Sequence, residues 1–160
     1  MKSELFNAIK GIEIDRLTED DLSELLKIFM GTKNSLIRDY IASVFSDLHF
    51  DRAAPYILKK INEKDVINNN GMLISSLYEL DVKKYFLSFI RMIGEYDYEA
   101  RLMAYELVLK YATLIPKKVK ESAIQILQEY IVKEQHSENE KGENSRLHFL
   151  EKTLELLQSV

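Results

Sequence analysis

The chain has 160 residues, 46% of them hydrophobic, which is enough for one domain with its own core. Its 22 basic and 26 acidic residues give a formal net charge of −4, so the overall charge does not attract nucleic acid or an anionic membrane. The absence of cysteine excludes disulfides and a catalytic thiol. No apolar signal segment follows the first residues and no stretch is apolar enough to span a membrane, so we expect a cytoplasmic protein.

Helix signals run through the chain, and strand signals do not. Glycine is rare, the only prolines are Pro55 and Pro116, and alternating apolar and polar runs bounded by turn residues are missing. The sequence therefore predicts an all-α protein.

Residues 1–33 are predicted to form N-terminal capping helices. A weak helix covers about residues 5–12. A stronger helix begins at Thr18, whose hydroxyl group can act as the N-cap while the acidic residues after it favour the positive end of the helix. Gly31 ends this helix.

The middle of the chain repeats itself. Residues 41–61 match residues 73–93 without a gap, at an offset of thirty-two positions. Matching positions share residue character, in the pairs Ile41 and Leu73, Phe45 and Leu77, Asp47 and Glu79, Ile57 and Phe89, Lys59 and Arg91, and Ile61 and Ile93. A period of roughly 20 to 50 residues with two helical halves is typical of an α-solenoid.

Three helix pairs are predicted over residues 34–132. The first pair begins at Asn34 or Ser35, and its second helix is capped by Asp51 and runs to about Glu63.

The second pair covers residues 72–80 and 82–93, and Gly94 ends it. In the third pair, Asp97 caps the first helix and Pro116 marks the start of the second.

The last part of the chain is predicted as a flexible polar loop over residues 133–144, because no apolar residue occurs from Glu134 to Asn144. Residues 145–160 then form a C-terminal capping helix. The sequence as a whole predicts a single domain, 1–160, folded as a short right-handed α-solenoid of antiparallel helix pairs with a capping helix at each end.

No residue pattern indicates catalysis. The histidines His49, His136 and His148 share no metal-ligand spacing, and glycine-rich phosphate loops and nucleophile motifs are missing. We therefore expect no metal, no cofactor and no enzymatic activity.

Acids and tyrosines are densest around the predicted start of the third helix pair. Glu95, Tyr96, Tyr98, Glu99 and Arg101 are the candidates for a partner-binding edge, because tyrosine gives contact area and carboxylates complement a basic partner. The alternative is structural, in which these residues cap a helix and cover a turn.

The second helices of the pairs are rich in basic residues, among them Lys59, Lys60, Lys84 and Arg91. Because stacked repeats align equivalent positions, we expect Lys59, Lys84 and Arg91 to form a basic ridge that holds a partner. Alternatively, they are solvated residues that keep the surface soluble.

The paired-helix unit resembles the HEAT-like repeat over residues 34–132. The resemblance is carried by Asp47 and Glu79 before the turn and by Lys59 and Arg91 in the second helix. It implies a fold that binds other macromolecules.

A second resemblance involves residues 71–81, which include Leu77 and end in Leu80-Asp81, and the Tyr-Glu-Ala-Arg run 98–101. These segments are similar to short all-helical immunity proteins of bacterial polymorphic toxin systems. That similarity implies a non-catalytic protein that binds and neutralises a cognate toxin domain. The alternatives are a general HEAT-like scaffold or adaptor and a HEAT-like DNA-binding protein or DNA glycosylase. We expect a protein partner rather than nucleic acid or a membrane, and the oligomeric state stays open.

Overall fold

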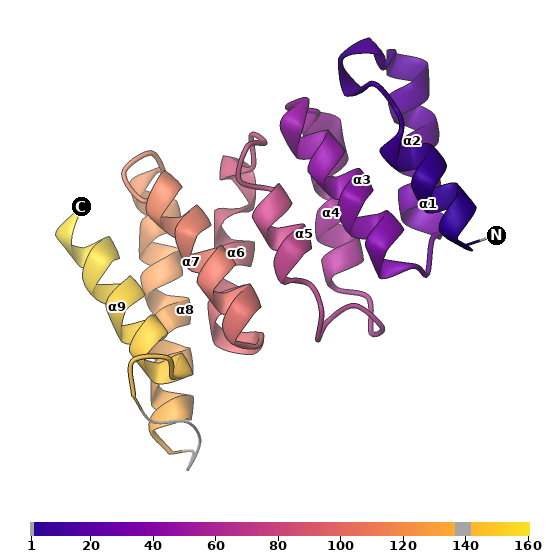
Figure 1. The fold of residues 1–160 in the computed structure, drawn as a ribbon. Coiled ribbons are helices and arrows are strands. Elements are labelled where there is room, and N and C mark those ends of the chain that lie inside the picture. The colour runs from indigo at the N-terminus through magenta and orange to yellow at the C-terminus, as the bar shows by residue number, and fades with distance from the viewer. Residues whose placement is uncertain (1, 137–141) are drawn as a thin grey trace. The chain divides into compact units, whose positions relative to one another are not determined.

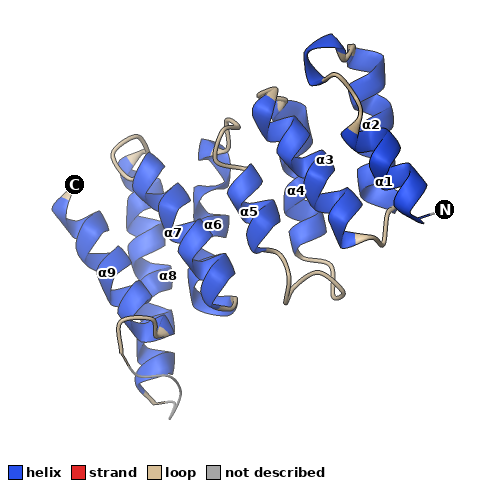
Figure 2. Ribbon diagram, viewed as in Figure 1, coloured by secondary structure: helices blue, strands red, loops and turns tan. Residues whose placement is uncertain are grey.

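The computed structural model describes residues 2–136 and 142–160, without the side chains of residues 2, 3, 5 and 6. Every regular element in these ranges is a helix and none is a strand, which confirms the all-α class (Figure 2). In chain order the elements are α1 (Lys2–Lys10), η1 (Ile14–Arg16), α2 (Glu19–Gly31), α3 (Ser35–Asp47), η2 (Asp51–Ala53), α4 (Ala54–Ile61), α5 (Gly71–Ser76), η3 (Lys83–Tyr85), α6 (Phe86–Glu95), α7 (Tyr98–Tyr111), α8 (Lys117–Gln135) and α9 (Arg146–Ser159) (Figure 1). Within the described ranges, no helix combines the length and the apolar character that a membrane crossing needs.

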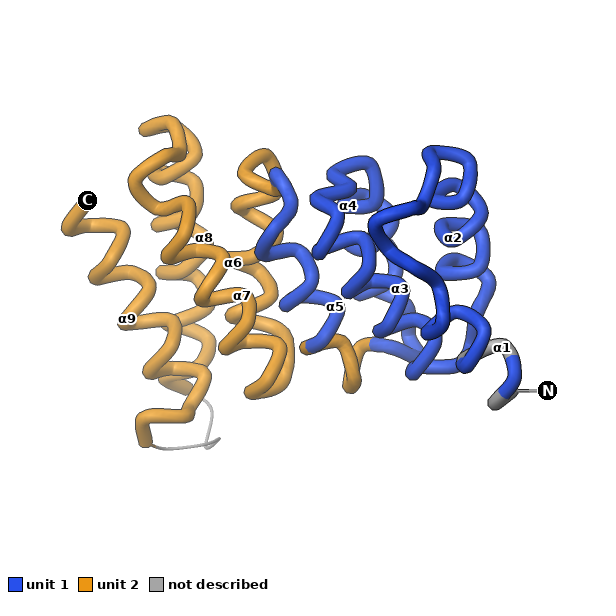
Figure 3. The backbone as a smooth tube through the Cα atoms, turned by 45° about the horizontal axis from the view of Figure 1, so that its top comes forward, with its two compact units in different colours: residues 1–66, 72–81 blue, residues 67–71, 82–160 orange. Residues whose placement is uncertain are grey.

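The predicted domain consists of two compact units (Figure 3). Unit 1 contains residues 1–66 and 72–81, and unit 2 contains residues 67–71 and 82–160. The chain therefore passes between the units more than once before α6 begins.

Local hydrogen bonds fix the helix starts of unit 1. The Thr18 hydroxyl accepts a hydrogen bond from the Asp21 backbone N–H at 3.2 Å, and the Asp21 carboxylate accepts one from the Thr18 N–H at 2.8 Å. The side-chain and backbone hydrogen bonds from Thr18 lower the pKa of Asp21. Asn34 caps α3 in the same way, through hydrogen bonds from the N–H groups of the first turn. Both predicted caps are confirmed.

The predicted cap at Asp51 is wrong. Asp51 lies inside the 3₁₀ helix η2, and its carboxylate accepts a hydrogen bond from the backbone N–H of Asp81 at 2.8 Å. Helix α4 begins three residues later and carries Pro55 in its first turn, as predicted. Asp51 thus fixes a distant turn of unit 1 instead of its own helix.

The predicted helix 72–80 is also shorter than expected. Helix α5 ends at Ser76, and the chain continues in turns in which Leu77 donates to the Ile74 carbonyl and Tyr78 to the Ser75 carbonyl. These turns place Leu77 and Leu80 in the interior.

Matching positions of the repeat are buried in both copies. The apolar pairs Ile41 and Leu73, Phe45 and Leu77, Ile57 and Phe89, and Ile61 and Ile93 are all fully buried. In unit 1, the Phe45 ring contacts Phe29 edge-on at 6.0 Å and Phe50 at 5.4 Å between centroids. The repeat in the sequence therefore corresponds to a repeat in burial.

After η3, unit 2 consists of the α-helices α6, α7, α8 and α9 in two layers. Helix α6 packs most closely with α7 and α8 with α9, while α6 also contacts α8 and α7 contacts α9 (Figure 1). The sequence paired α7 with α8 instead. The helices that pack most closely are therefore not the predicted pair. Helix α7 packs on the helix before it, α6, to which the 95–98 turn joins it, and α8 packs on the helix after it, α9.

The prediction that Gly94 ends the second helix pair is wrong, because Gly94 lies within α6 and is buried. A Cβ atom built on Gly94 would come within 2.7–2.8 Å of three ring carbons of Tyr130 on α8. Glycine is needed here because the Tyr130 ring rests directly on the helix backbone.

The predicted loop 133–144 begins too early. Helix α8 continues to Gln135, and the Glu134 carboxylate accepts a hydrogen bond from Arg146 Nη1 at 3.2 Å. This pairing favours helix in a segment that has no apolar residue. Residues 137–141 of the predicted loop lie outside the described residues. After them, Gly142 adopts φ +106° in a turn, and Ser145 caps α9 by accepting a hydrogen bond from His148 N–H.

The contact between Gly94 and Tyr130 predicts a stability effect. Because an added methyl group would overlap the Tyr130 ring and force it to shift, Gly94→Ala overpacks the interface at a cost of about 1–3 kcal/mol, against a gain of up to about 1 kcal/mol in helix propensity. We expect a net loss of about 1–2 kcal/mol in the free energy of unfolding, measured by urea denaturation. The control is Gly31→Ala at the end of α2, where nothing lies within 4 Å, and it should be neutral or slightly stabilising. Equal or higher stability of Gly94→Ala would contradict the proposed close contact.

Candidate functional site

Two predicted partner-binding residues, Arg91 and Glu95, lie together on unit 2. They are exposed and one helical turn apart on α6. The Tyr130 hydroxyl on α8 donates a hydrogen bond to the Glu95 carboxylate, and its ring covers Gly94. Arg91, Glu95 and Tyr130 form what we term the Tyr130 cluster.

The Tyr130 cluster perturbs the acidity of its central tyrosine. Burial, and then the hydrogen bond to Glu95 and its negative charge, raise the pKa of Tyr130 from 10.0 to about 12, while Arg91 acts in the opposite direction. Burial and then the Glu95 charge also raise the pKa of Tyr96. Tyr130 therefore stays a hydrogen-bond donor at neutral pH. The cluster offers a guanidinium group, a hydroxyl group and a carboxylate, all suited to charge-assisted hydrogen bonds.

The sequence did not identify Tyr130 as a candidate binding residue, although two patterns indicate that it is packed against a neighbouring helix. It lies three residues after Leu127 and seven after Ala123, both buried on α8, so it lies on the packed face of that helix. A glycine inside a helical pattern, here Gly94, often marks a close contact. Neither pattern shows that Tyr130 and Gly94 contact each other.

Tyr98 and Glu99 are on the surface at the start of α7, as predicted. The Tyr98 side chain is 44% exposed, and its ring meets Phe149 of α9 edge-on at 6.1 Å. The exposed Glu99 side chain lies over Gly71, where an added Cβ would come within 2.7 Å of its Cγ and Cδ atoms. Each of these two side chains is thus open to solvent on one side and packed against unit 2 on the other.

Tyr96 and Arg101 require a correction, because both are interior residues and not part of an exposed edge. Their exposed fractions are 6% and 1%. Arg101 donates to the carbonyl oxygens of Asn144 at 2.9 Å and Tyr96 at 3.3 Å, and its guanidinium group lies 5.8 Å from the ring centroid of Phe149. These contacts hold the side chain inside unit 2.

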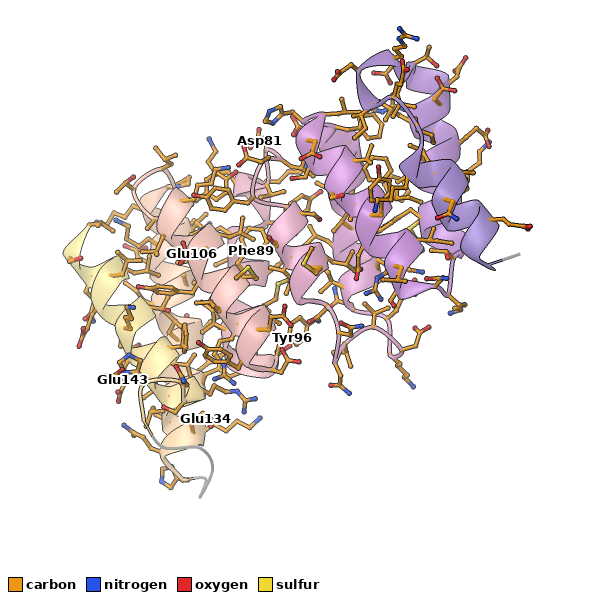
Figure 4. All side chains as sticks on the ribbon, in the orientation of Figure 1. Asp81, Phe89, Tyr96, Glu106, Glu134 and Glu143 are labelled. Atoms are coloured by element: carbon orange, nitrogen blue, oxygen red, sulfur yellow. The ribbon has the colours of Figure 1, made fainter. Side chains whose placement is uncertain are left out.

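A second arginine, which is half-buried, contacts one of the same carbonyl groups. Arg146, which begins α9, donates through Nη2 to the Tyr96 carbonyl at 3.4 Å and through Nη1 to Glu134. Figure 4 shows Tyr96 and Glu134 at the same end of unit 2, where α6 gives way to α7 and where α8 ends. We term Tyr96, Arg101, Glu134, Asn144 and Arg146 the arginine junction. It supports the structural interpretation for Tyr96 and Arg101.

The residues of the expected basic ridge are all exposed, but they belong to different units. Lys59 lies on α4 in unit 1, whereas Lys84 on η3 and Arg91 on α6 lie in unit 2. The Lys84 ammonium group is 5.0 Å from the ring centroid of Tyr85. A continuous ridge stays a prediction.

Lys60, grouped with the surface bases in the sequence, is buried. Only 2% of its side chain is exposed, and its ammonium group donates to the Met30 carbonyl at 3.1 Å and pairs with Glu63 at 3.0 Å. The Met30 carbonyl is near the C-terminal end of α2, where carbonyl groups lack partners within the helix. Lys60 therefore stabilises the end of α2 from α4.

Neighbouring lysines provide a matched test of this role. Lys60→Met keeps the length of the side chain but leaves the part-buried Met30 carbonyl without this donor, so we expect a loss of about 1–3 kcal/mol in the free energy of unfolding. Lys59→Met, at the exposed neighbouring position, should change it by less than about 0.5 kcal/mol. Chemical denaturation of both variants measures the difference, and equal stabilities would show that the Lys60 hydrogen bond contributes nothing.

The raised pKa of Tyr130 predicts a pH-dependent contribution to stability. Because the folded state holds this proton more tightly than the unfolded state, the contribution is complete below about pH 10 and is lost as the pH rises towards 12. Tyr130→Phe lacks it, so the difference in unfolding free energy between wild type and this variant should shrink across that interval. Tyr56→Phe, at an exposed position on unit 1, controls for the loss of a hydroxyl group elsewhere. If the difference in unfolding free energy between wild type and Tyr130→Phe stays constant from pH 10 to pH 12, the pKa of Tyr130 is not raised in the folded state.

Among residues 2–136 and 142–160, no group of three or more histidine, aspartate or glutamate side chains is placed to hold a metal ion. Comparisons of the chain with protein-family models, with curated proteins and with solved structures gave no match.

Proposed function

We propose that the chain is a non-catalytic protein-binding module, and specifically an immunity protein that binds and neutralises a cognate bacterial toxin domain in the cytoplasm. The Tyr130 cluster is the observation that carries the binding part of this proposal. Arg91 and Glu95 are exposed, and their charges are held beside an aromatic residue that packs on the α6 backbone. Aromatic residues and arginine are the side chains most enriched at the energetic centres of protein interfaces.

The proposed surface extends from the Tyr130 cluster to Tyr98 and Glu99, which follow Glu95 across the turn into α7. Packing of the Tyr98 ring against Phe149 reduces the rotamer freedom that binding would otherwise remove. A surface whose side chains are already ordered binds with a smaller entropic cost, which suits a tight inhibitor.

We also infer a short right-handed α-solenoid of HEAT-like helix pairs with capping helices, the architecture that the sequence predicts. Its support is the offset of thirty-two residues, at which matching apolar positions are buried in both copies.

The support for toxin neutralisation is the resemblance carried by residues 71–81 and 98–101. The test is to co-express the chain with a toxic domain encoded beside its gene. We expect restored growth and a stable one-to-one complex on size-exclusion chromatography.

Variants of the cluster test where the toxin domain binds. We expect Arg91→Glu and Tyr98→Ala each to weaken binding by at least about thirtyfold, as removal of an interface hot spot does. The control Lys117→Glu reverses an exposed charge on α8 of the same unit, with its side chain 90% exposed, and should leave affinity unchanged. Calorimetric titration measures all three after circular dichroism has shown intact folding.

Other outcomes overturn particular parts of the proposal. Saturable, salt-sensitive binding of duplex DNA that Arg91→Glu weakens would favour the nucleic-acid alternative. Binding to a protein other than a toxin would leave the scaffold alternative. Unchanged affinity of both cluster variants for the toxin domain would place the interface elsewhere.

A further inference from the structure

Unit 1 contains an open groove of about 400 Å³ between the segment around η1 and helix α2. The apolar part of its lining consists of Ile12, Leu17, Leu25 and Ile28. Leu25 is buried, whereas Ile12, Leu17 and Ile28 are half-buried and keep apolar surface open to solvent. The volume is near the lower end of the range for ligand sites, roughly 300–1,000 Å³, and accommodates a few aliphatic side chains.

The rim of the groove is acidic. Glu13, Asp21 and Glu24 line it, and Arg16 is the one basic residue among the described lining residues. Asp21 is engaged in the cap of α2. Glu13 and Glu24 remain as exposed carboxylates on opposite walls, one from the η1 segment and one from α2.

Both of these carboxylates have exchangeable partners. Glu13 pairs with Arg16 at 2.7 Å with side chains 66% and 80% exposed, and Glu24 pairs with Lys27 at 2.5 Å with side chains 66% and 71% exposed. Exposed pairs between neighbours on one helical turn contribute little to stability. A cation from a partner can therefore replace Arg16 or Lys27 at small cost.

We infer that the groove between η1 and α2 docks a basic amphipathic helix of a partner protein. Its apolar side chains, at helical spacing, enter the apolar floor, and its lysine or arginine side chains pair with Glu13 and Glu24. This is the helix-in-groove mode of recognition. The charge of the rim selects this occupant, because an acidic helix or an anionic lipid surface is repelled by the same carboxylates. The inference does not rest on the proposed function, since the Tyr130 cluster belongs to unit 2.

The direct test uses two synthetic peptides that share leucines at helical three-and-four spacing. One carries lysine at the remaining positions and the other carries glutamate. Fluorescence anisotropy with the full chain should show saturable binding of the lysine peptide that weakens as salt is added, and no binding of the glutamate peptide. A third peptide, with the lysines but with serine in place of leucine, should not bind, because the apolar floor is then left empty.

Charge reversal on the chain locates the site. The double variant Glu13→Lys with Glu24→Lys should weaken binding of the lysine peptide by about tenfold or more, because two attractive contacts become repulsive. The control Glu121→Lys disrupts an exposed pair of the same kind with Lys117 on unit 2 and should bind as the wild type does. A second variant, Ile28→Asp, should abolish binding, and the double charge variant decides the matter if Ile28→Asp fails to fold.

Three results would overturn the inference. They are the absence of saturable binding by the lysine peptide, equal binding of the lysine and glutamate peptides, and unchanged affinity of the double charge variant. If the double variant still neutralises a toxin domain while losing the peptide, the groove and the proposed toxin surface are separate sites. Failure of the toxin experiment alone leaves the peptide result standing.

Discussion

Two guanidinium groups, from Arg101 on α7 and Arg146 on α9, converge on the backbone carbonyl of Tyr96, and unit 2 depends on this arrangement. The Arg101 side chain is buried, and a buried charge needs hydrogen-bond partners, so the position of this guanidinium group is closely constrained. Through the Tyr96 carbonyl and the Glu134 carboxylate, the arginine junction joins the α6–α7 turn, the end of α8 and the start of α9. The same two helices, α6 and α8, also meet where the Tyr130 ring lies on Gly94.

The proposed binding surface is a consequence of that packing. Arg91 and Glu95 would be two mobile surface charges on α6 without Tyr130, whose ring is ordered by the backbone beneath it and whose hydroxyl holds the Glu95 carboxylate. The packing of the interior thus orders the side chains of the proposed binding surface. This also explains why the densest run of tyrosines and charges in the chain divides into two groups. Tyr96 and Arg101 serve the interior, whereas Tyr98 and Glu99 remain outside.

Unit 1 uses the same principle in a simpler form. Here a buried ammonium group acts instead of two guanidinium groups. Lys60 on α4 donates a hydrogen bond to a backbone carbonyl at the C-terminal end of α2. The opposite end of α2 is closed by the hydrogen bonds between Thr18 and Asp21. With both ends satisfied, α2 keeps an apolar stripe that the η1 segment covers only partly, and the groove between them is the part that remains open.

The sequence by itself determined the all-helical class, the repeat at thirty-two residues and the helix starts at Thr18, Asn34, Asp97 and Ser145, because each cap forms hydrogen bonds within three residues of itself. It also identified Arg91 and Glu95 as candidate binding residues. Only the tertiary structure decided the roles of Asp51, Lys60, Gly94 and Arg101, because each of them has at least one partner thirty or more positions away in the sequence. It likewise decided the place of Tyr130, which is thirty-five positions from Glu95. Local patterns specify where a helix begins because the partners are adjacent in the chain, but the burial of a charge or the need for a glycine depends on which distant helix packs against it.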